Sequence, residues 1–242
     1  MNLELNLANP APLQKERGEE LAAGQPPVFV LNNAQLSYQG KVVLNNVSLT
    51  ISAGERVALV GKSGVGKSTL LAALREQNPN ALAWCPQQSG LVPMLSVYHN
   101  MYMGGLQRHN SFYNLLNLMK PLAQPLREVT ELAALLQLDK HLFDPVEQLS
   151  GGQAQRVAIG RALYQEQSIF LGDEAVSGVD EHQAQQLLTL IVEKHASVVL
   201  ALHDVEQALR FCDRIIGLKD GAIVLDAPSS TLTVNDLSEL YR

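Results

Sequence analysis

The chain has 242 residues, of which 46% are hydrophobic and 17% charged, and its formal net charge is −6. This composition is typical of a globular protein with a sizeable core, and it excludes disordered and membrane-spanning classes. The acidic balance, without clustered Lys and Arg, argues against nucleic acid as a partner. The two cysteines, Cys85 and Cys212, are too few for a disulfide framework, and no signal peptide or transmembrane run is evident. We therefore expect a cytosolic, reduced protein with both cysteines buried.

Residues 1–27 mix Asn, Pro, Gln, Glu and Ala without a settled hydrophobic period, which predicts a flexible tail. One domain is expected over 28–242. It should begin with antiparallel strands, because its alternating and β-branched runs are separated by turn residues at Gln39-Gly40 and Ala53-Gly54. The predicted strands span 28–31, 35–38 and 47–51.

An apolar strand predicted over 56–60 leads into a Gly-rich loop and a helix predicted over 69–76. The loop has the spacing G-x-x-x-x-G-K-S of a phosphate-binding loop, in which glycines let backbone N–H groups face a phosphate. Lys67 would reach the β and γ phosphates, and Ser68 would offer a hydroxyl to Mg²⁺. A Gly-rich turn that happens to contain Lys is the alternative, which the flanking strand and helix disfavour. The predicted nucleotide-binding residues here are Gly61, Lys62, Ser63, Gly64, Val65, Gly66, Lys67, Ser68 and Thr69.

The middle of the chain, 100–137, is rich in Leu, Met and Ala at helical spacing, with breaks at Pro121 and Pro125, and this predicts a mostly helical insertion. Strands and helices then alternate. The expected fold class is α/β, with a mostly parallel core sheet, an N-terminal antiparallel β subdomain and a helical subdomain at about 96–165. The later strands are predicted over 168–171, 197–202, 214–218 and 222–225, and the last two flank a predicted turn at Lys219-Asp220-Gly221. The later helices are predicted over 180–195 and 204–211.

Two adjacent carboxylates, Asp173 and Glu174, follow the apolar strand predicted over 168–171. At the C-terminal end of a parallel strand, near a phosphate loop, such a pair suits a metal-binding Asp and a Glu that activates water. A solvated surface pair is the alternative, and the apolar strand before it disfavours that interpretation.

The pentapeptide Leu-Ser-Gly-Gly-Gln at 149–153 precedes a helix predicted over 154–165, with Ser150 at the N-cap position. Helix N-termini attract phosphate, so this is a second anion site, although 61–69 already cradles one set of phosphates. In isolation, the segment would be interpreted as a Ser-capped helix after a Gly turn. Together with the phosphate loop and the Asp-Glu pair, in this order, it makes almost all of 28–242 resemble the ATP-binding-cassette (ABC) ATPases.

The resemblance implies a P-loop NTPase core that binds Mg²⁺-ATP and hydrolyses it between two copies of the chain arranged head to tail. Each ATP would lie between the phosphate loop of one subunit and the signature pentapeptide of the other. Ser150, Gly151, Gly152 and Gln153 would therefore contact the partner's nucleotide. Tyr38 matches the aromatic residue that stacks on adenine, with a half-buried strand tyrosine as the alternative.

Further positions match family motifs. Gln87 matches the Gln loop, whose amide contacts Mg²⁺ and the attacking water and senses the permease, and Gln88 is the alternative. His203 matches the switch histidine that binds the γ-phosphate. Ser177 and Asp180 match the D-loop, which couples the two sites across the dimer, and an ordinary helix cap is the alternative. The implied catalytic residues are Glu174, His203 and Gln87, and the implied magnesium ligands are Ser68, Gln87 and Asp173. The other histidines, at 99, 109, 141, 182 and 195, are interpreted as surface or packing residues.

Some positions depart from the family pattern. Ala175 stands where Pro is usual, and Gly178-Val179 stand where Ala-Leu is common. The interval from Lys67 to Gln87 is short, so the antiparallel subdomain is expected to be shortened. None of these differences removes a reactive group, and an active ATPase is expected.

The resemblance also implies a location at the cytoplasmic face of the cell membrane, where the chain would power a separate permease, with a solute-binding protein in the same system. A permease helix is expected to dock on 87–103, where Leu91, Met94 and Tyr98 are candidate exposed apolar residues. The segments 86–97, 111–112 and 240–242 look like those of phosphonate-importer ATPases.

Several alternatives stay open. Within transport, they are another small-solute importer or a two-chain exporter of lipid or peptide. From another class, a soluble ABC ATPase of translation or DNA repair is disfavoured by the single signature, the single phosphate loop and the lack of sustained heptads. A nucleotide-binding regulator without turnover is disfavoured by Glu174 and His203.

Overall fold

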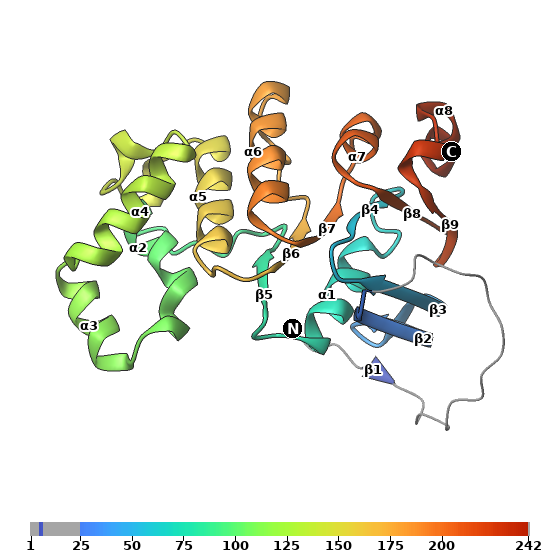
Figure 1. Cartoon of the computed structure of the whole chain (residues 1–242), viewed down its shortest axis with the longest axis horizontal. Coiled ribbons are helices and arrows are strands. Elements are labelled where there is room, and N and C mark those ends of the chain that lie inside the picture. Colours follow the sequence, from blue (N-terminus) through green and yellow to red (C-terminus); the bar gives the residue numbers. More distant parts are fainter. Residues whose placement is uncertain (1–4, 7–24, 242) are drawn as a thin grey trace. The chain divides into compact units, whose positions relative to one another are not determined.

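The computed structural model describes residues 5–6 and 25–241, which fall into two compact units (Figure 1). Of the described residues, the first unit comprises 5–6, 25–79 and 201–241, and the second comprises 80–200. Strands and helices alternate in both, which confirms the α/β fold class. Among the described residues, none of the helices has the length and hydropathy needed to cross a bilayer.

The first unit opens with a long hairpin of β2 (Pro27–Tyr38) and β3 (Lys41–Ser52), joined by a tight turn. Gln39 and Gly40 both have positive φ, of 50° and 73°, as a type I′ turn requires. The two short strands expected over 28–31 and 35–38 are one continuous strand. A register irregularity near Asn33, whose φ is 46°, lets the pairing continue through the polar interval between them.

The segment expected to be a tail contributes three described residues, Leu5, Asn6 and Pro27, to this sheet. Strand β1 (Leu5–Asn6) pairs antiparallel with β2, with Leu5 opposite Leu36. The rest of that segment before Gln25 lies outside the described residues. The resulting order is β1-β2-β3.

The other strands of the first unit carry the phosphate loop. Strand β4 (Arg56–Val60) has the predicted bounds and pairs parallel with β8 (Arg214–Lys219). Strand β8 pairs antiparallel with β9 (Ala222–Pro228) around the predicted turn, where Asp220 and Gly221 have positive φ. The helical elements of this unit are α1 (Lys67–Gln77), α7 (Val205–Phe211), η4 (Ser229–Thr231), α8 (Val234–Ser238) and η5 (Glu239–Tyr241).

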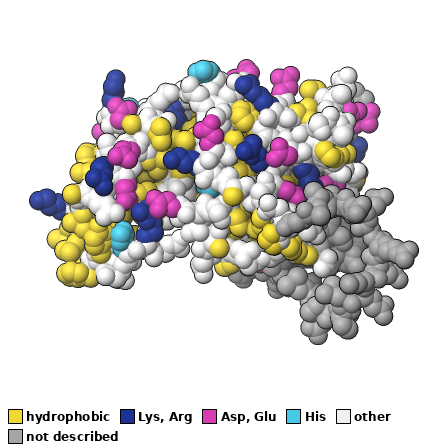
Figure 2. Space-filling model, viewed as in Figure 1, with side chains coloured by type: hydrophobic (Ala, Val, Ile, Leu, Met, Phe, Trp, Pro, Cys, Tyr) yellow, Lys and Arg dark blue, Asp and Glu magenta, His cyan; other side chains and the backbone are white. Residues whose placement is uncertain are grey.

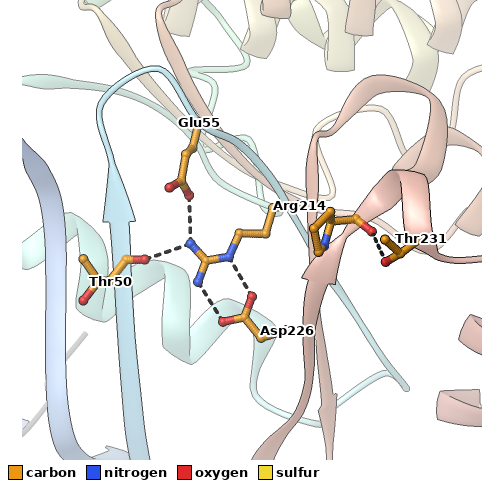
Figure 3. Close-up of polar contacts among 6 residues, drawn as sticks. Thr50, Glu55, Arg214, Asp226 and Thr231 are labelled. Carbon is orange, nitrogen blue, oxygen red and sulfur yellow. Dashed lines mark hydrogen bonds and ion pairs between the residues drawn. The ribbon is translucent and has the colours of Figure 1, made fainter. Parts of the chain in front are cut away.

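A single arginine ties three strands of this unit together (Figure 3). Arg214 of β8 donates to both carboxylate oxygens of Asp226 on β9, at 2.6 and 2.7 Å. It also donates to the carbonyl of Thr50 on β3 and to the carboxylate of Glu55, both at 2.9 Å. The bidentate contact with Asp226 raises the pKa of Arg214, so the guanidinium stays charged.

In the second unit the strands follow the order β5-β6-β7, and β5 and β6 run parallel, with Cys85 opposite Gly172. Phe170, Leu171 and residues 197–201 are fully or nearly fully buried, as expected for strands covered on both faces. The strands are β5 (Leu82–Cys85), β6 (Ile169–Asp173) and β7 (Ser197–Ala201), with the division between units at the end of β7.

Helices fill the rest of the second unit, where α2, α4 and α5 pack against one another (Figure 1). The predicted break at Pro121 is present, but the break expected at Pro125 is wrong. Pro125 lies in the first turn of α4, where proline removes no helical hydrogen bond. The elements are α2 (Val97–Tyr102), η1 (Met103–Arg108), α3 (Ser111–Met119), α4 (Ala123–Leu135), η2 (Asp139–His141), η3 (Val146–Gln148), α5 (Gly151–Leu163) and α6 (Glu181–Lys194).

Helix α3 presents polar side chains to the protein and apolar side chains to solvent. Asn117 is buried and accepts hydrogen bonds from the Tyr98 hydroxyl and the Leu122 amide, both at 2.8 Å. Its outer residues make up most of a hydrophobic patch that is visible over α3 in Figure 2. An uncovered patch of this kind marks an interaction surface. The exposed apolar residues of α3 are Phe112, Leu115, Leu116, Leu118 and Met119.

Candidate functional site

The predicted phosphate loop lies between β4 and α1 and depends on glycine at two crowded positions. A Cβ on Gly61 would lie 2.3 Å from the Leu218 carbonyl oxygen, and one on Gly66 would lie 2.8 Å from Leu44 Cγ. Both residues have φ values, 143° and 117°, that side chains rarely allow. Only glycine therefore fits this loop without displacing its neighbours.

Lys67 is the first residue of α1, and its side chain reaches back to the start of the loop. Its side chain is 4% exposed, and Nζ donates to the carbonyls of Gly61 and Lys62 at 2.8 and 3.1 Å. Helix α1 begins at Lys67 after Gly66 and has no side-chain cap, and a helix N-terminus favours an anion. Beside the loop is an open hollow of about 620 Å³, lined by residues 62–65, 41–43 and 218–221.

Two more expected nucleotide contacts belong to this unit. Tyr38 ends β2 with 42% of its surface exposed, so a ring face is available for stacking. His203 follows β7 and is exposed.

Tyr241 connects the loop with the His203 segment. Its hydroxyl oxygen accepts from the Gly61 N–H at 3.3 Å and donates to the His203 carbonyl at 3.4 Å. Burial raises the pKa of Tyr241, so the hydroxyl keeps the proton that it donates.

In the second unit the structure brings Gln87 and Glu174 together. The parallel pairing of β5 and β6 makes the segments after Cys85 and Gly172 leave from the same edge. Gln87 Nε2 donates to Glu174 Oε2 at 3.1 Å. Asp173 ends β6 and is 5% exposed, and Glu174 has a φ of 53°, a conformation found at functional sites.

The 149–153 segment has the predicted helix cap. Ser150 Oγ accepts from the backbone N–H of Gln153 at 3.3 Å. The backbone N–H of Ser150 donates to the side-chain oxygen Oε1 of Gln153 at 2.8 Å, which completes a capping box. A Cβ on Gly152 would lie 3.4 Å from the Gly178 carbonyl, so this segment lies against the one containing Ser177. Asp180 caps α6 through the Gln183 amide at 2.9 Å, as the helix-cap alternative proposed.

The structure also shows contacts that the sequence analysis missed. The Arg161 guanidinium, on α5, donates to the carbonyls of Ser89 and Gly90, and so ties the segment after Gln87 to this helix. His141 was interpreted as a surface or packing residue, yet it contacts Gln153. Neither contact has a local signal, because each depends on how distant parts of the chain pack.

Other expectations concern packing and metal binding. Both cysteines are buried, and burial raises the pKa of each thiol to about 12, which confirms their packing role. Tyr98 was expected to be exposed for docking, and this is wrong. It is fully buried, with its hydroxyl bonded to Asn117. No group of three or more His, Cys, Asp or Glu side chains suited to a metal occurs among the residues that the structure describes.

The chain matches the family model described as ABC transporter over residues 44–81 and 75–177. It is 36% identical to the phosphonates import ATP-binding protein PhnC 1 of Pseudomonas syringae pv. tomato, over 84% of this chain and 86% of that protein. It is 30% identical to the probable ABC transporter ATP-binding protein p29 of Mycoplasma pneumoniae, over 89% of this chain and 98% of that protein. Identity to PhnC of Anaeromyxobacter dehalogenans is 33% over 91% of this chain, which spans 50% of that relative's length.

Solved structures give the same result. The ATP-binding cassette MJ0796, in a dimeric post-hydrolysis state bound to ADP and phosphate, is 26% identical with a TM-score of 0.67. The match covers 83% of this chain and 98% of that one. A second dimeric structure of the same bacterial ABC transporter cassette has a TM-score of 0.69 over the same shares.

Proposed function

The chain belongs to the ABC transporter family as an ATP-binding and ATP-hydrolysing subunit, and from this premise we propose that it powers a separate membrane permease that imports phosphonates. The observation that carries the substrate class is the identity of 32–36% to phosphonate-import subunits across more than four-fifths of the chain. The family resemblance inferred from the motifs is thereby confirmed, while the residue roles below are proposals.

ATP would bind the first unit through the loop at 61–69. The backbone N–H groups and the start of α1 would hold the β and γ phosphates, and Lys67 would exchange its two carbonyl contacts for phosphate oxygens. Tyr38 would stack on the adenine, and the imidazole of His203 would bind the γ-phosphate.

Mg²⁺ would be held by Ser68, Asp173 and Gln87. These side chains offer hydroxyl, carboxylate and amide oxygens, which are the donors that Mg²⁺ prefers. The deep burial of Asp173 supports the assignment, because a buried carboxylate is stabilised by a cation. When bound, Mg²⁺ would supply positive charge that offsets the negative charge of the phosphates during transfer.

Glu174 would orient the attacking water and accept its proton. A carboxylate can do this only if its oxygens are oriented toward the water. Here the side-chain amide of Gln87 donates a hydrogen bond to one oxygen of Glu174 at 3.1 Å, which fixes the carboxylate's orientation. Gln87 would thus act on Glu174 directly, besides its expected contacts with Mg²⁺ and water.

A second copy of the chain would complete each site. Ser150, Gly151, Gly152 and Gln153 at the start of α5 would receive the partner's γ-phosphate, as a helix N-terminus favours an anion. Ser177, in the segment against Gly152, would cross the dimer interface with Asp180.

The permease would dock on the second unit, and the chain would then lie at the cytoplasmic face of the membrane. Met94 is 81% exposed, Leu91 is partly exposed, and Tyr98 is replaced as a docking candidate by the apolar face of α3. Helix α3 is bonded to α2 through Asn117, so both belong to one surface. Both native cysteines are buried, so cysteines introduced at Met94 and Phe112 can be labelled selectively. They should crosslink to the permease, and a cysteine at Val42 of β3, also exposed, should not.

Uptake by the reconstituted complex tests the proposed function. The chain, its permease and its solute-binding protein are placed in proteoliposomes with ATP inside and labelled methylphosphonate outside. We expect ATP-dependent uptake that Lys67→Ala abolishes. Transport of another solute without methylphosphonate uptake would contradict the substrate class, and ATP hydrolysis with no transported solute would contradict the transport role.

A further inference from the structure

A line of hydrogen bonds runs from the turn after η2 to the start of α5. Asp144 Oδ2 lies 2.7 Å from His141 Nδ1, and His141 Nε2 lies 3.1 Å from Gln153 Nε2. Gln153 Oε1 lies 2.8 Å from the Ser150 amide nitrogen. The line therefore ends on the N-cap of the helix that carries the signature.

The Ser150 end of this line determines which atoms donate and which accept along it. The Ser150 N–H can only donate, so the Gln153 atom facing it is the amide oxygen, and the amide NH₂ faces His141. An NH₂ group donates, so His141 Nε2 accepts. The imidazole proton is then on Nδ1 and is donated to Asp144.

The backbone holds His141 in place for this contact. His141 ends η2, its N–H donates to the Leu138 carbonyl at 2.9 Å, and its carbonyl accepts from the Asp144 N–H at 2.9 Å. Leu138 is fully buried and anchors the turn. The His141 side chain is 38% exposed, so its bonds contribute little to the stability of the fold.

We propose that His141, oriented by Asp144, is a positioning residue for the signature. It holds the side-chain amide of Gln153, and through it the N-terminus of α5, in the arrangement that receives the partner's ATP. This inference rests on the proposed function of the signature. Without His141, the Gln153 side chain would have to be ordered when the dimer forms, which weakens dimerisation by about threefold to tenfold for each of the two signatures. Nucleotide binding by the monomer, through 61–69, would be unaffected.

The experiment uses the full chain with Glu174→Gln, in which ATP should hold the dimer together. Light scattering gives the protein concentration at half dimerisation in Mg²⁺-ATP, and a fluorescent ATP analogue gives the monomer's affinity. His141→Ala should raise the half-dimerisation concentration by about tenfold to a hundredfold, because both signatures are affected, at unchanged monomer affinity. His141→Gln, whose amide oxygen can accept in place of Nε2, should restore part of the loss.

His182 supplies the matched control, because it lies 3.0 Å from a glutamine, Gln186, on the exposed surface of α6. His182→Ala should leave dimerisation unchanged. In a Gln153→Ala background, His141→Ala should have no further effect, since the side chain through which it contacts the signature is then gone.

The outcomes separate this inference from the function on which it rests. If the Glu174→Gln parent does not dimerise with ATP, the proposed role of the signature and the positioning role of His141 are both contradicted. If the parent dimerises and His141→Ala matches it, only the positioning role is overturned. An equal loss in the presence and absence of Gln153, or a matching loss of monomer affinity, would show a general structural effect and also overturn it.

Discussion

The hydroxyl of Tyr241 links the phosphate loop to the segment that contains His203, and Tyr241→Phe removes that hydroxyl alone. The Gly61 N–H loses its acceptor and the His203 carbonyl loses its donor. A net hydrogen bond contributes about 0.5–1.5 kcal/mol, and bonds of this length lie at the weak end, so we assign about 1 kcal/mol to the pair. Because ATP must then order the loop, this corresponds to about a fivefold rise in the KM for ATP.

Steady-state ATPase kinetics give the measurement. KM should rise about fivefold, and kcat should change less, because the Gln87–Glu174 contact is untouched. Tyr102→Phe is the matched control, since it removes a shorter bond, 2.7 Å to Asn114, from the helical part of the second unit. A Tyr241→Phe enzyme with wild-type KM, or an equal rise in KM for Tyr102→Phe, would refute the reasoning.

Three further changes give expectations of known sign. Arg214→Met should lower the free energy of unfolding, measured in urea, by about 2–3 kcal/mol. Arg214→Lys should recover only part of that free energy, because Lys cannot make the bidentate contact with Asp226. Equal stabilities of the wild type and the two variants would contradict this. Burial lowers the pKa of His195 from 6.5, so below that pH the unfolded chain binds a proton that the folded chain resists. Stability should therefore fall as the pH drops below 6.5, less steeply in His195→Leu, and parallel curves would exclude this origin. Gly66→Ala should lose at least tenfold in ATP affinity, because its Cβ would meet Leu44, whereas Gly54→Ala, at a φ of 84° with open space, should keep it.

Local signals predicted much of the fold. The bounds of β4, the loop that follows it and the Ser150 cap all come from short runs whose backbone geometry depends on neighbouring residues. The predicted turns at Gln39-Gly40 and Asp220-Gly221 were correct for the same reason, since both need positive φ.

The wrong predictions concern residues whose burial or secondary structure depends on tertiary packing. Tyr98 lies in the segment expected to dock the permease, but its burial depends on α3, which brings Asn117 to its hydroxyl. Pro125 falls inside a helix because α4 happens to start two residues before it. The roles of His141 and Tyr241 depend on contacts across 12 and 180 residues, which no pattern in a single sequence reveals.

The central claim is that two copies of this chain enclose ATP and that Glu174 drives its hydrolysis. The most direct measurement is light scattering of Glu174→Gln with and without Mg²⁺-ATP, together with phosphate release. We expect a monomer without nucleotide, a dimer with ATP and almost no turnover, because the amide keeps the size of Glu174 but cannot accept a proton. Ser150→Arg, added to this variant, should bind ATP and stay monomeric. A Glu174→Gln protein that hydrolyses ATP at the wild-type rate, or that stays monomeric with ATP bound, would contradict the account.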